Sequence, residues 1–205
     1  LSELITKIFS PKGNQTTMSR DEVSAMVDVG TSEGIFKESE SKIIKSCIRL
    51  SSVKAEQIMT PFIVIESANE NLTVKEFYDL KSWNFSRIPV YGSDKEYISG
   101  YIMKDDVLKE LSDDNFSTTL FDLARPILSF REDDSAYCIW EKMLEKREHL
   151  SIIVDEYGCL RGVVSMEDII EAMTGVEIVD EDDVAIDMQA LAKEKSKALS
   201  QSRKA

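Results

Sequence analysis

Ser165 and Asp168 are the residues whose types and spacing point most directly to chemistry. They lie in the sequence GVVSMED of residues 162–168, where an apolar β-type run passes into a helical pattern. One role is structural, because a serine at a helix start and an acidic residue three positions later satisfy backbone N–H groups. A second role uses the same geometry: free N–H groups at a helix start suit a phosphate, and a short carboxylate accepts hydrogen bonds from ribose hydroxyls. These residues alone leave both roles open.

The rest of the sequence contains no recognisable catalytic arrangement. It has no nucleophile–base pair, no glycine-rich phosphate loop and no cluster with metal-ligand spacing. The cysteines, Cys47, Cys138 and Cys159, are odd in number and lack short regular spacing, which favours a reducing, cytosolic environment over disulfides or zinc. We therefore predict a protein that is not an enzyme and has no metal site. The single histidine, His149, is expected to be partly buried and hydrogen-bonded.

Composition favours a globular protein of one or two domains. The chain has 205 residues, of which 42% are hydrophobic and 31% charged. Its net charge of −13 disfavours nucleic acid as a partner, because phosphate neutralisation needs a basic stripe, and it also disfavours an anionic membrane surface. No apolar run approaches the roughly 18 residues that a membrane-spanning helix needs.

The first part of the chain predicts an acidic helical segment. Ser19 and Glu22 form a capping box, and Gly30 and Gly34 are expected to end the helix that follows. A second helix is predicted over residues 37–50 from its apolar face. The acidic side chains of this region form either a solvated helix face or a weak site for a hard divalent cation. They are Asp21, Glu22, Asp28, Glu33, Glu38 and Glu40.

A β-α-β-β-α pattern then occurs twice. Pro61 and Pro126 open the two copies 65 residues apart, and Gly100 and Gly162 lie 62 residues apart, so a deletion of three residues brings the copies into register. A strand is expected at residues 63–65 in the first copy. Two copies packed sheet to sheet would bury both apolar faces. We predict a linker at 1–18, an acidic helical segment at 19–56, one repeat at 57–115, a second at 116–178, and an acidic then basic tail at 179–205.

The sequence at 162–168 resembles the signature of cystathionine-β-synthase-type (CBS) domains, and residues 100–106 repeat it with Met103 in place of the hydroxyl residue. Together the two copies resemble a tandem CBS pair, or Bateman module. Further stretches resemble the cytosolic region of CorC/HlyC-type membrane transporters, a cyclin M-like and hemolysin-related group implicated in magnesium and cobalt transport. These stretches are residues 30–34, 58–61, 86–91, 153–158, 162–170 and 187–192.

The resemblance implies an α+β fold in which a CBS pair follows a small acidic helical segment. It implies an adenine nucleotide, ATP or AMP with or without Mg²⁺, in a cleft between the repeats, with Asp168 on the ribose. It also implies a homodimer formed through CBS pairs. A membrane domain would precede residue 1, which places this region at the cytoplasmic face of a membrane. The main alternative is a nucleotide-free CBS pair that serves only as a dimerisation scaffold.

Several residues become candidates for the same nucleotide site, each with a plainer alternative. The planar fork of Arg87 matches phosphate oxygens, or it pairs with a surface carboxylate. Thr60 precedes a proline and is therefore extended or in a turn, and its hydroxyl would contact a phosphate or the base. Ser86 would donate to a phosphate, or it only ends a helix. The apolar candidates would line or stack on the adenine, or belong to the core. The predicted nucleotide-binding residues are Thr60, Ile63, Phe85, Ser86, Arg87, Ile88, Pro89, Ser165 and Asp168.

Two departures from the CorC pattern affect these expectations. Phe62 stands where a basic residue usually follows Met-Thr-Pro, which removes one phosphate partner, and the usual C-terminal transporter-associated domain does not follow Asp183. Because Met103 offers no hydroxyl, we expect at most one well-formed nucleotide site per chain, at Ser165 and Asp168. Given the negative charge of the chain, ATP is expected to bind more strongly with Mg²⁺.

Overall fold

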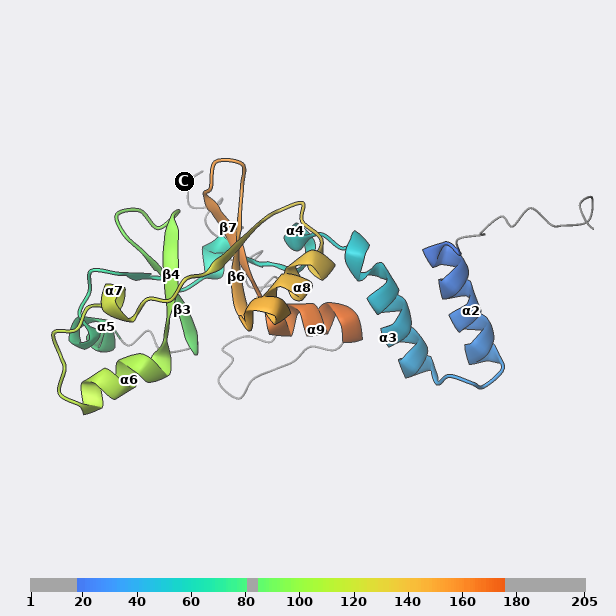
Figure 1. Ribbon diagram of the computed structural model, residues 1–205, viewed down its shortest axis with the longest axis horizontal. Coiled ribbons are helices and arrows are strands. Elements are labelled where there is room, and N and C mark those ends of the chain that lie inside the picture. Colours follow the sequence, from blue (N-terminus) through green and yellow to red (C-terminus); the bar gives the residue numbers. More distant parts are fainter. Residues whose placement is uncertain (1–17, 81–84, 176–205) are drawn as a thin grey trace, which may run out of the picture. The chain divides into compact units, whose positions relative to one another are not determined.

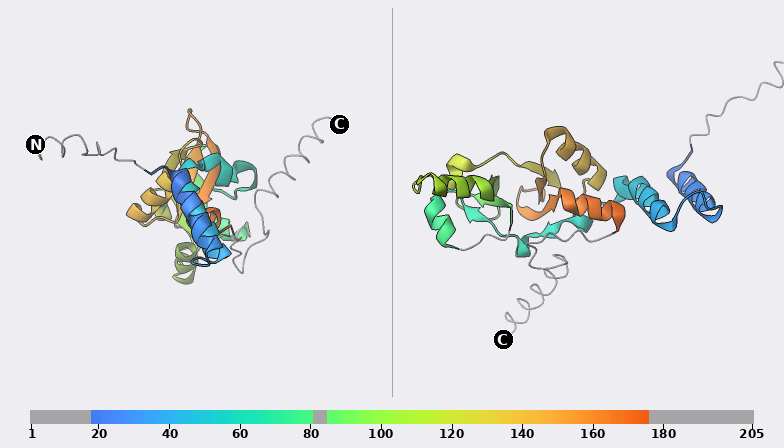
Figure 2. Two further views of the ribbon diagram at one scale, coloured as in Figure 1. Left: turned by 90° about the vertical axis from the view of Figure 1, so that its right-hand side faces the viewer. Right: turned by 90° about the horizontal axis from the view of Figure 1, so that it is seen from below.

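The computed structural model describes residues 18–80 and 85–175, which belong to two compact units divided between Ile48 and Arg49. The first unit contains a helical hairpin of α2 (Arg20–Ser32) and α3 (Glu38–Arg49), drawn in blue in Figures 1 and 2. The predicted linker, apart from Met18, and the predicted tail at 179–205 lie outside the described residues.

The start of α2 confirms the capping box. The backbone N–H of Glu22 donates to Ser19 Oγ at 3.2 Å, and the Ser19 N–H donates to Glu22 Oε2 at 2.7 Å. The prediction that Gly30 ends this helix is wrong, because α2 continues to Ser32. Gly30 serves packing instead, since a Cβ there would lie 2.9 Å from the ring of Phe36.

The acidic residues of the hairpin are all exposed, as a solvated face requires. Besides Glu22 in the capping box, Asp28 pairs with Lys45 at 2.5 Å, and Glu40 accepts from the Lys37 N–H at 2.8 Å. Within residues 18–80 and 85–175, no group of three histidine, cysteine or acidic side chains is placed to hold a metal ion. The solvated-face interpretation therefore fits the described part of the chain.

The second unit contains two β-α-β-β-α repeats, which confirms the predicted α+β class (Figure 1). The first repeat consists of β2 (Ala68–Asn69), α5 (Val74–Asp79), β3 (Arg87–Tyr91), β4 (Ile98–Met103) and α6 (Lys104–Ser112). The second consists of β5 (Leu128–Arg131), α8 (Ala136–Lys146), β6 (Leu150–Val154), β7 (Leu160–Ser165) and α9 (Met166–Thr174). Short elements lead into them: η1 (Leu50–Ser52), α4 (Ala55–Ile58), β1 (Thr60–Pro61) and η2 (Phe62–Val64) before the first, and α7 (Leu120–Leu123) before the second.

The strand expected at residues 63–65 is not formed. The Ile65 N–H donates to the Phe62 carbonyl at 3.1 Å, which closes a 3₁₀ turn over this apolar run. The turn buries Val64 and leaves Ile63 36% exposed. The first strand of this repeat comes later, at β2, where it pairs in parallel with β3.

The two repeats exchange their leading segments. One sheet has the order β2-β3-β4 and the other β1-β7-β6-β5, so that β1, which precedes the first repeat, joins the sheet of the second. Thr60 lies opposite Val163 in this antiparallel pair. In the same way Arg125, which precedes the second repeat, bridges Tyr101 of β4 through backbone hydrogen bonds of 2.8 and 3.0 Å.

Two glycines permit this exchange. A Cβ on Gly162 would lie 2.7 Å from the Thr60 carbonyl oxygen, and a Cβ on Gly100 would lie 2.5 Å from that of Arg125. Backbone atoms so close leave no room for any side chain. The glycine that opens each CBS-like signature is therefore explained by the strand that crosses it.

Gly162→Ala is expected to lower the free energy of unfolding by about 1–3 kcal/mol, because the new methyl group overpacks the β1–β7 contact. Urea unfolding measures the change. Gly92→Ala is the matched control, since its Cβ would meet only the flexible carboxylate of Glu70, at 3.1 Å, and should cost about 0.5 kcal/mol or less. Equal losses in the two variants would contradict the close-approach explanation.

Each repeat has its own hydrophobic core between its sheet and its helices. In the first repeat Ile88, Val90 and Ile102 belong to this core. Because side chains alternate along a strand, Arg87, Pro89, Tyr101 and Met103 project from the opposite face of the sheet. In the second repeat Ile153 and Val164 are in the core, so Val163 and Ser165 lie on the opposite face. The candidate binding residues on β3 and β7 are therefore divided between core and opposite faces.

None of the helices within the described ranges combines the length and the apolar character that a bilayer crossing requires.

Candidate functional site

Ser165 and Asp168 form the helix cap that their spacing predicts. Ser165 is the N-cap of α9, and its N–H and hydroxyl donate to Asp168 Oδ2 at 2.6 and 2.8 Å. The Asp168 N–H donates back to Ser165 Oγ at 3.2 Å. Both bonds to the carboxylate go to Oδ2, and within the described residues no hydrogen bond reaches Oδ1. The cap therefore leaves one carboxylate oxygen for another donor.

The environment of Asp168 disfavours its charge. Burial raises the pKa of this carboxyl from 3.8 to about 6, although the two hydrogen bonds from Ser165 act in the opposite direction. The nearby charges of Glu171 and Glu167 raise it further. Near neutral pH the group is a carboxylate with few donors around it. Hydroxyl groups that donate to Oδ1 would therefore stabilise the ionised form.

We expect the stability contribution of Asp168 to fall as the pH rises. Its folded pKa of about 6 exceeds the ordinary value of 3.8, so its contribution is complete below about pH 4 and is lost as the pH rises through 6. Between about pH 4.5 and 7.5 the expected loss is up to about 2 kcal/mol, since one pKa unit is worth about 1.4 kcal/mol. Urea unfolding of the wild type and Asp168→Asn at both pH values isolates this effect. Identical pH dependence in the two proteins would contradict it.

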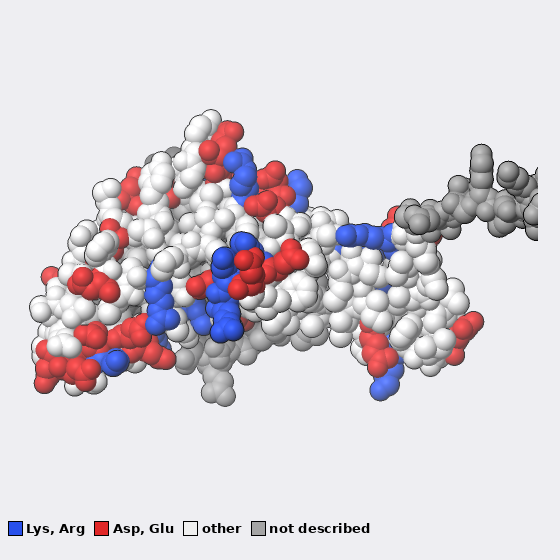
Figure 3. All heavy atoms as spheres, viewed as in Figure 1, with Lys and Arg blue, Asp and Glu red and all other residues white. Residues whose placement is uncertain are grey.

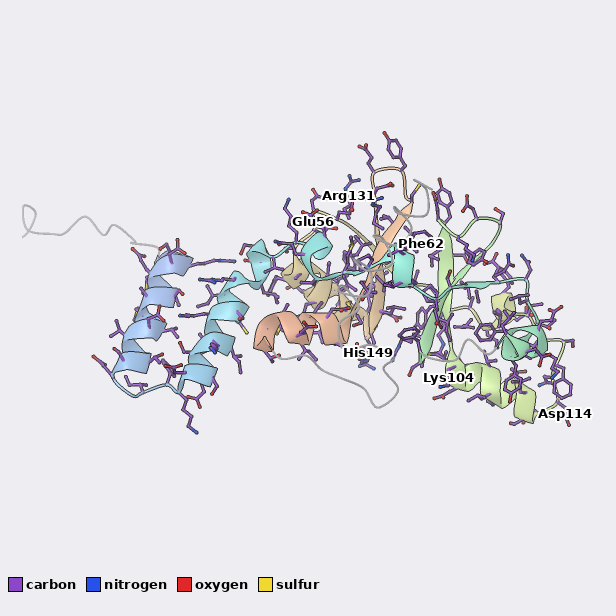
Figure 4. All side chains as sticks on the ribbon, turned by 180° about the vertical axis from the view of Figure 1, so that it is seen from behind. Glu56, Phe62, Lys104, Asp114, Arg131 and His149 are labelled. Atoms are coloured by element: carbon purple, nitrogen blue, oxygen red, sulfur yellow. The ribbon has the colours of Figure 1, made fainter. Side chains whose placement is uncertain are left out.

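Thr60 and Ile63 both lie beside β7, the strand that leads into this cap, because β1 and η2 contact it. Thr60 faces Val163, two residues before Ser165 on the neighbouring strand. Ile63 lies on η2, which packs against β7, and is partly open to solvent. Phe62, labelled in Figure 4, lies on the same turn. The segment after α4 thus places the Thr60 hydroxyl beside β7 near the start of α9, whereas Ile63 follows β1 towards the opposite end of β7.

The remaining candidates belong to the first repeat, at the start of β3. Arg87 has no ion pair among the described residues, and Ser86 is exposed, with its carbonyl accepting from the Lys104 N–H at 2.9 Å. Pro89 is buried on the face opposite the core, and Phe85 is partly buried. No described hydrogen bond or ion pair links this group to Ser165 or Asp168. Its participation in the same site remains a prediction.

Of its two predicted roles, core packing or the wall of an adenine site, Ile88 has the first in this structure. It is 3% exposed and packs within the core of the first repeat. Alternation along β3 directs it away from the face that carries Arg87 and Pro89. Only its backbone remains available to a ligand.

The equivalent site of the first repeat is occupied by the protein's own side chains. Met103 is the N-cap of α6 and makes no side-chain cap. Asp106, the equivalent of Asp168, accepts a hydrogen bond from the guanidinium of Arg125 at 2.7 Å. Beside it, the hydroxyl of Tyr101 donates to Glu148 Oε2 at 2.8 Å, and burial and this carboxylate raise the pKa of the tyrosine. The first site is therefore internally paired.

The expectation for His149 is wrong, because this side chain is exposed and no described hydrogen bond reaches its ring (Figure 4). Its backbone carbonyl accepts from the Met166 N–H at 3.0 Å, which fixes the start of α9. The equivalent carbonyl in the first repeat is that of Ser86. His149 and Ser86 therefore have the same backbone role in the two repeats. This role does not involve the histidine ring, which is exposed to solvent.

Two stretches of the chain, residues 55–113 and 120–175, match the family model of the CBS domain. The chain belongs to the CBS-domain family. The two matches together span more than half of the chain, and each contains one of the repeats.

Curated relatives of this CBS pair include the UPF0053 protein sll1254 of Synechocystis, which is 32% identical over 204 residues, 99% of this chain and 59% of that protein. The magnesium and cobalt efflux protein CorC of Escherichia coli is 26% identical over 166 residues, 80% of this chain and 56% of that protein. The chain therefore spans less than two thirds of these relatives.

A solved CBS domain of the bacterial CNNM/CorC family Mg²⁺ transporter matches with a TM-score of 0.74 and 26% identity, covering 79% of this chain and 99% of that one. A structure of such a CBS domain in complex with ATP matches with a TM-score of 0.63 and 26% identity, covering 66% and 97%. These similarities agree with the CorC-type resemblance of the sequence.

Sequence reasoning missed the residues that join the two repeats through side-chain hydrogen bonds, among them Tyr101, Arg125 and Glu148. A signal for Arg125 was present, because the 65-residue offset between Pro61 and Pro126 aligns it with Thr60. No comparable signal identified the bond between Tyr101 and Glu148, since it joins residues 47 positions apart in different repeats.

Proposed function

We propose that this CBS pair binds an adenine nucleotide at Ser165 and Asp168 and thereby regulates a membrane protein of the CorC type. The observation that carries the proposal is the Asp168 carboxylate, which is partly buried at a helix start and bonded through only one oxygen. The similar CBS domain of a bacterial CNNM/CorC family Mg²⁺ transporter, whose structure was solved in complex with ATP, supports it.

In this proposal the ribose hydroxyls donate to Asp168 Oδ1. The N-terminus of α9 and the hydroxyls of Ser165 and Thr60 provide donors near a phosphate. Arg87 and Ser86 approach the phosphates from the first repeat, where the guanidinium matches phosphate oxygens. Ile63, Phe85 and Pro89, with the backbone of Ile88, complete the surroundings of the base.

Magnesium is expected to favour ATP binding. On the face that Figure 3 shows, basic side chains lie among acidic ones and form no continuous basic surface. With a net charge of −13, the chain repels a free triphosphate at long range, and a chelated Mg²⁺ reduces that repulsion. We therefore propose Mg²⁺–ATP as the physiological form, with AMP as the competing ligand.

Regulation requires that the nucleotide bind one arrangement of the repeats better than another. A ligand that contacts both Asp168 in the second repeat and Arg87 in the first would do so, because it bridges them. We propose that this change reaches a membrane domain preceding residue 1, at the cytoplasmic face, and alters transport of a divalent cation such as magnesium.

Thermal unfolding of the chain with a panel of nucleotides tests the proposal. ATP, ADP and AMP, each with and without Mg²⁺, are compared with GTP. A nucleotide at 100 times its Kd should add about 2.7 kcal/mol, or about 5–10 °C for a protein of this size. The absence of a shift with every adenine nucleotide would contradict nucleotide sensing. Equal ATP affinity without Mg²⁺ would contradict only the role of the metal.

The exposed apolar side chains of the helices favour a second role, in dimerisation. Tyr137 and Leu144 are exposed on α8 by 42% and 53%, with Trp140 partly buried between them, and Ile170 of α9 is 38% exposed. A helix face that presents apolar side chains at such intervals is typical of an interface. The equivalent helices of the first repeat expose Tyr78 and Leu108, by 47% and 41%. Because both repeats present this face, we propose that a second copy covers it about a twofold axis.

A further inference from the structure

The two repeats present equivalent sites in which the same aspartate has different neighbours. Superposing the repeats by their sequence offsets aligns Asp168 with Asp106, Ser165 with Met103, and Thr60 with Arg125. The backbone confirms this register, because Thr60 and Arg125 make the same antiparallel bridge, to Val163 and Tyr101 respectively. The aspartate is common to both sites, so the difference between them lies in its partners.

In the first site, Arg125 supplies the hydrogen-bond donor that an external ligand would otherwise supply to the aspartate. Its guanidinium Nη2 lies 2.7 Å from Asp106 Oδ2, and both groups are partly exposed, by 50% and 34% of their side chains. The carboxylate is thus neutralised by a donor from the other repeat. In the second site the aligned residue is a threonine, which has neither the charge nor the length to reach Asp168.

The first site also joins the repeats without a ligand. Arg125 leads into the second repeat and bonds Asp106 of the first, while Tyr101 of the first repeat bonds Glu148 of the second. The aligned residues in the other site are Val163 and Phe85, which cannot form such a hydrogen bond. The two polar side-chain bridges at the first site therefore have no counterpart among the aligned residues of the second site.

We propose that the side chain of Arg125 occupies the first site and thereby restricts nucleotide binding to the second site. In the second site the nucleotide would take the place that Arg125 has beside Asp106 in the first. This inference rests on the proposed function for its ligand. It assigns a specificity-determining role to a residue outside the predicted binding set. The stoichiometry of one nucleotide per chain then follows from two side chains, Arg125 and Met103, rather than from a difference in fold.

Exchange of the two positions tests the proposal. Met103→Ser with Arg125→Thr gives the first site the cap serine and the threonine of the second, and calorimetric titration with Mg²⁺–ATP should show one equivalent more than the wild type binds. The same two changes in an Asp168→Asn background should retain one equivalent, assigned to the first site. A folded double variant that gains no equivalent would overturn the proposal.

The reciprocal variant, Thr60→Arg, gives a second test should the double variant fail to fold. The new guanidinium is expected to pair with Asp168, to weaken ATP binding at least tenfold and to leave the unfolding midpoint unchanged or raised. Undiminished ATP binding in this variant would overturn the proposal. If the wild type binds no nucleotide, the proposed function fails, but a gain of one equivalent in the Met103→Ser, Arg125→Thr variant would still support the role of Arg125.

Discussion

Asp168→Asn is expected to weaken adenine nucleotide binding by about 10- to 100-fold. A hydrogen bond to a charged group contributes about 1.5–3 kcal/mol, and each 1.4 kcal/mol is about tenfold in Kd. The amide keeps an acceptor for Ser165 but places an NH₂ group or a neutral oxygen before the ribose. Calorimetric titration with Mg²⁺–ATP at neutral pH measures the loss.

The two repeats provide a matched control for this variant. Asp106→Asn makes the same chemical change at the equivalent helix start, where the carboxylate pairs with Arg125. We expect it to leave nucleotide affinity within about twofold of the wild type and to change stability by about 1 kcal/mol or less, because its ion pair is partly exposed. If both variants lose affinity equally, or if only Asp106→Asn does, the site is not at Asp168.

Stability separates a binding role from a purely structural one. Because Asp168 is ionised at neutral pH despite its raised pKa of about 6, its replacement by a neutral amide should leave the folded protein at least as stable at pH 7.5. A residue retained only as a helix cap would instead be costly to change. Unfolding of Asp168→Asn at a clearly lower urea concentration would favour the structural role alone.

Leu144→Glu is expected to convert a CBS-pair dimer into a monomer at micromolar concentration. The side chain is 53% exposed on α8, so the substitution costs the isolated chain little. In a twofold interface the new carboxylate would be desolvated without a partner, and a buried unpaired charge costs several kcal/mol. Sedimentation equilibrium measures the change in association.

Tyr157→Glu is the control for this experiment. Tyr157 is 77% exposed in the turn between β6 and β7, away from the helix face, and should leave association unchanged. A wild-type chain that is monomeric at all concentrations would exclude the proposed dimer of this chain. Loss of association in both variants would place the interface elsewhere.

The repeat and its caps were predictable because their signals are local. Capping boxes such as Ser19 with Glu22 and Ser165 with Asp168 depend on residues three positions apart, and all appear in the structure. The β-α-β-β-α order likewise follows from local hydrophobic periods. These features together determine the fold class.

The side of a strand on which a residue lies was harder to predict. Ile88 and Pro89 were both assigned to the wall of an adenine site, yet adjacent residues of a strand project to opposite faces. The sequence pattern shows that Ile88 and Pro89 project from opposite faces of the strand, but it does not show which of the two enters the core. Packing against α5 and α6 decides it, since Ile88 joins Val74, Phe77 and Val107 there.

Contacts between repeats were the least predictable. The exchange of β1 with the second sheet depends on the close approach of Thr60 to Gly162, and the pairing of Arg125 with Asp106 joins residues 19 positions apart. Neither produces a periodic pattern within one element. Only alignment of the two copies against each other would have drawn attention to Arg125.

The exchanged strands make the two halves of the tandem mutually dependent. A cut between residues 115 and 116 would strand β1 in a half that has no β7, and would leave β4 without the segment around Arg125. Each fragment would expose an unpaired strand edge at the glycine, Gly100 or Gly162, against which the backbone of the other fragment packs in the intact protein. Although the sequence shows two copies, we expect the smallest unit that folds to contain both repeats.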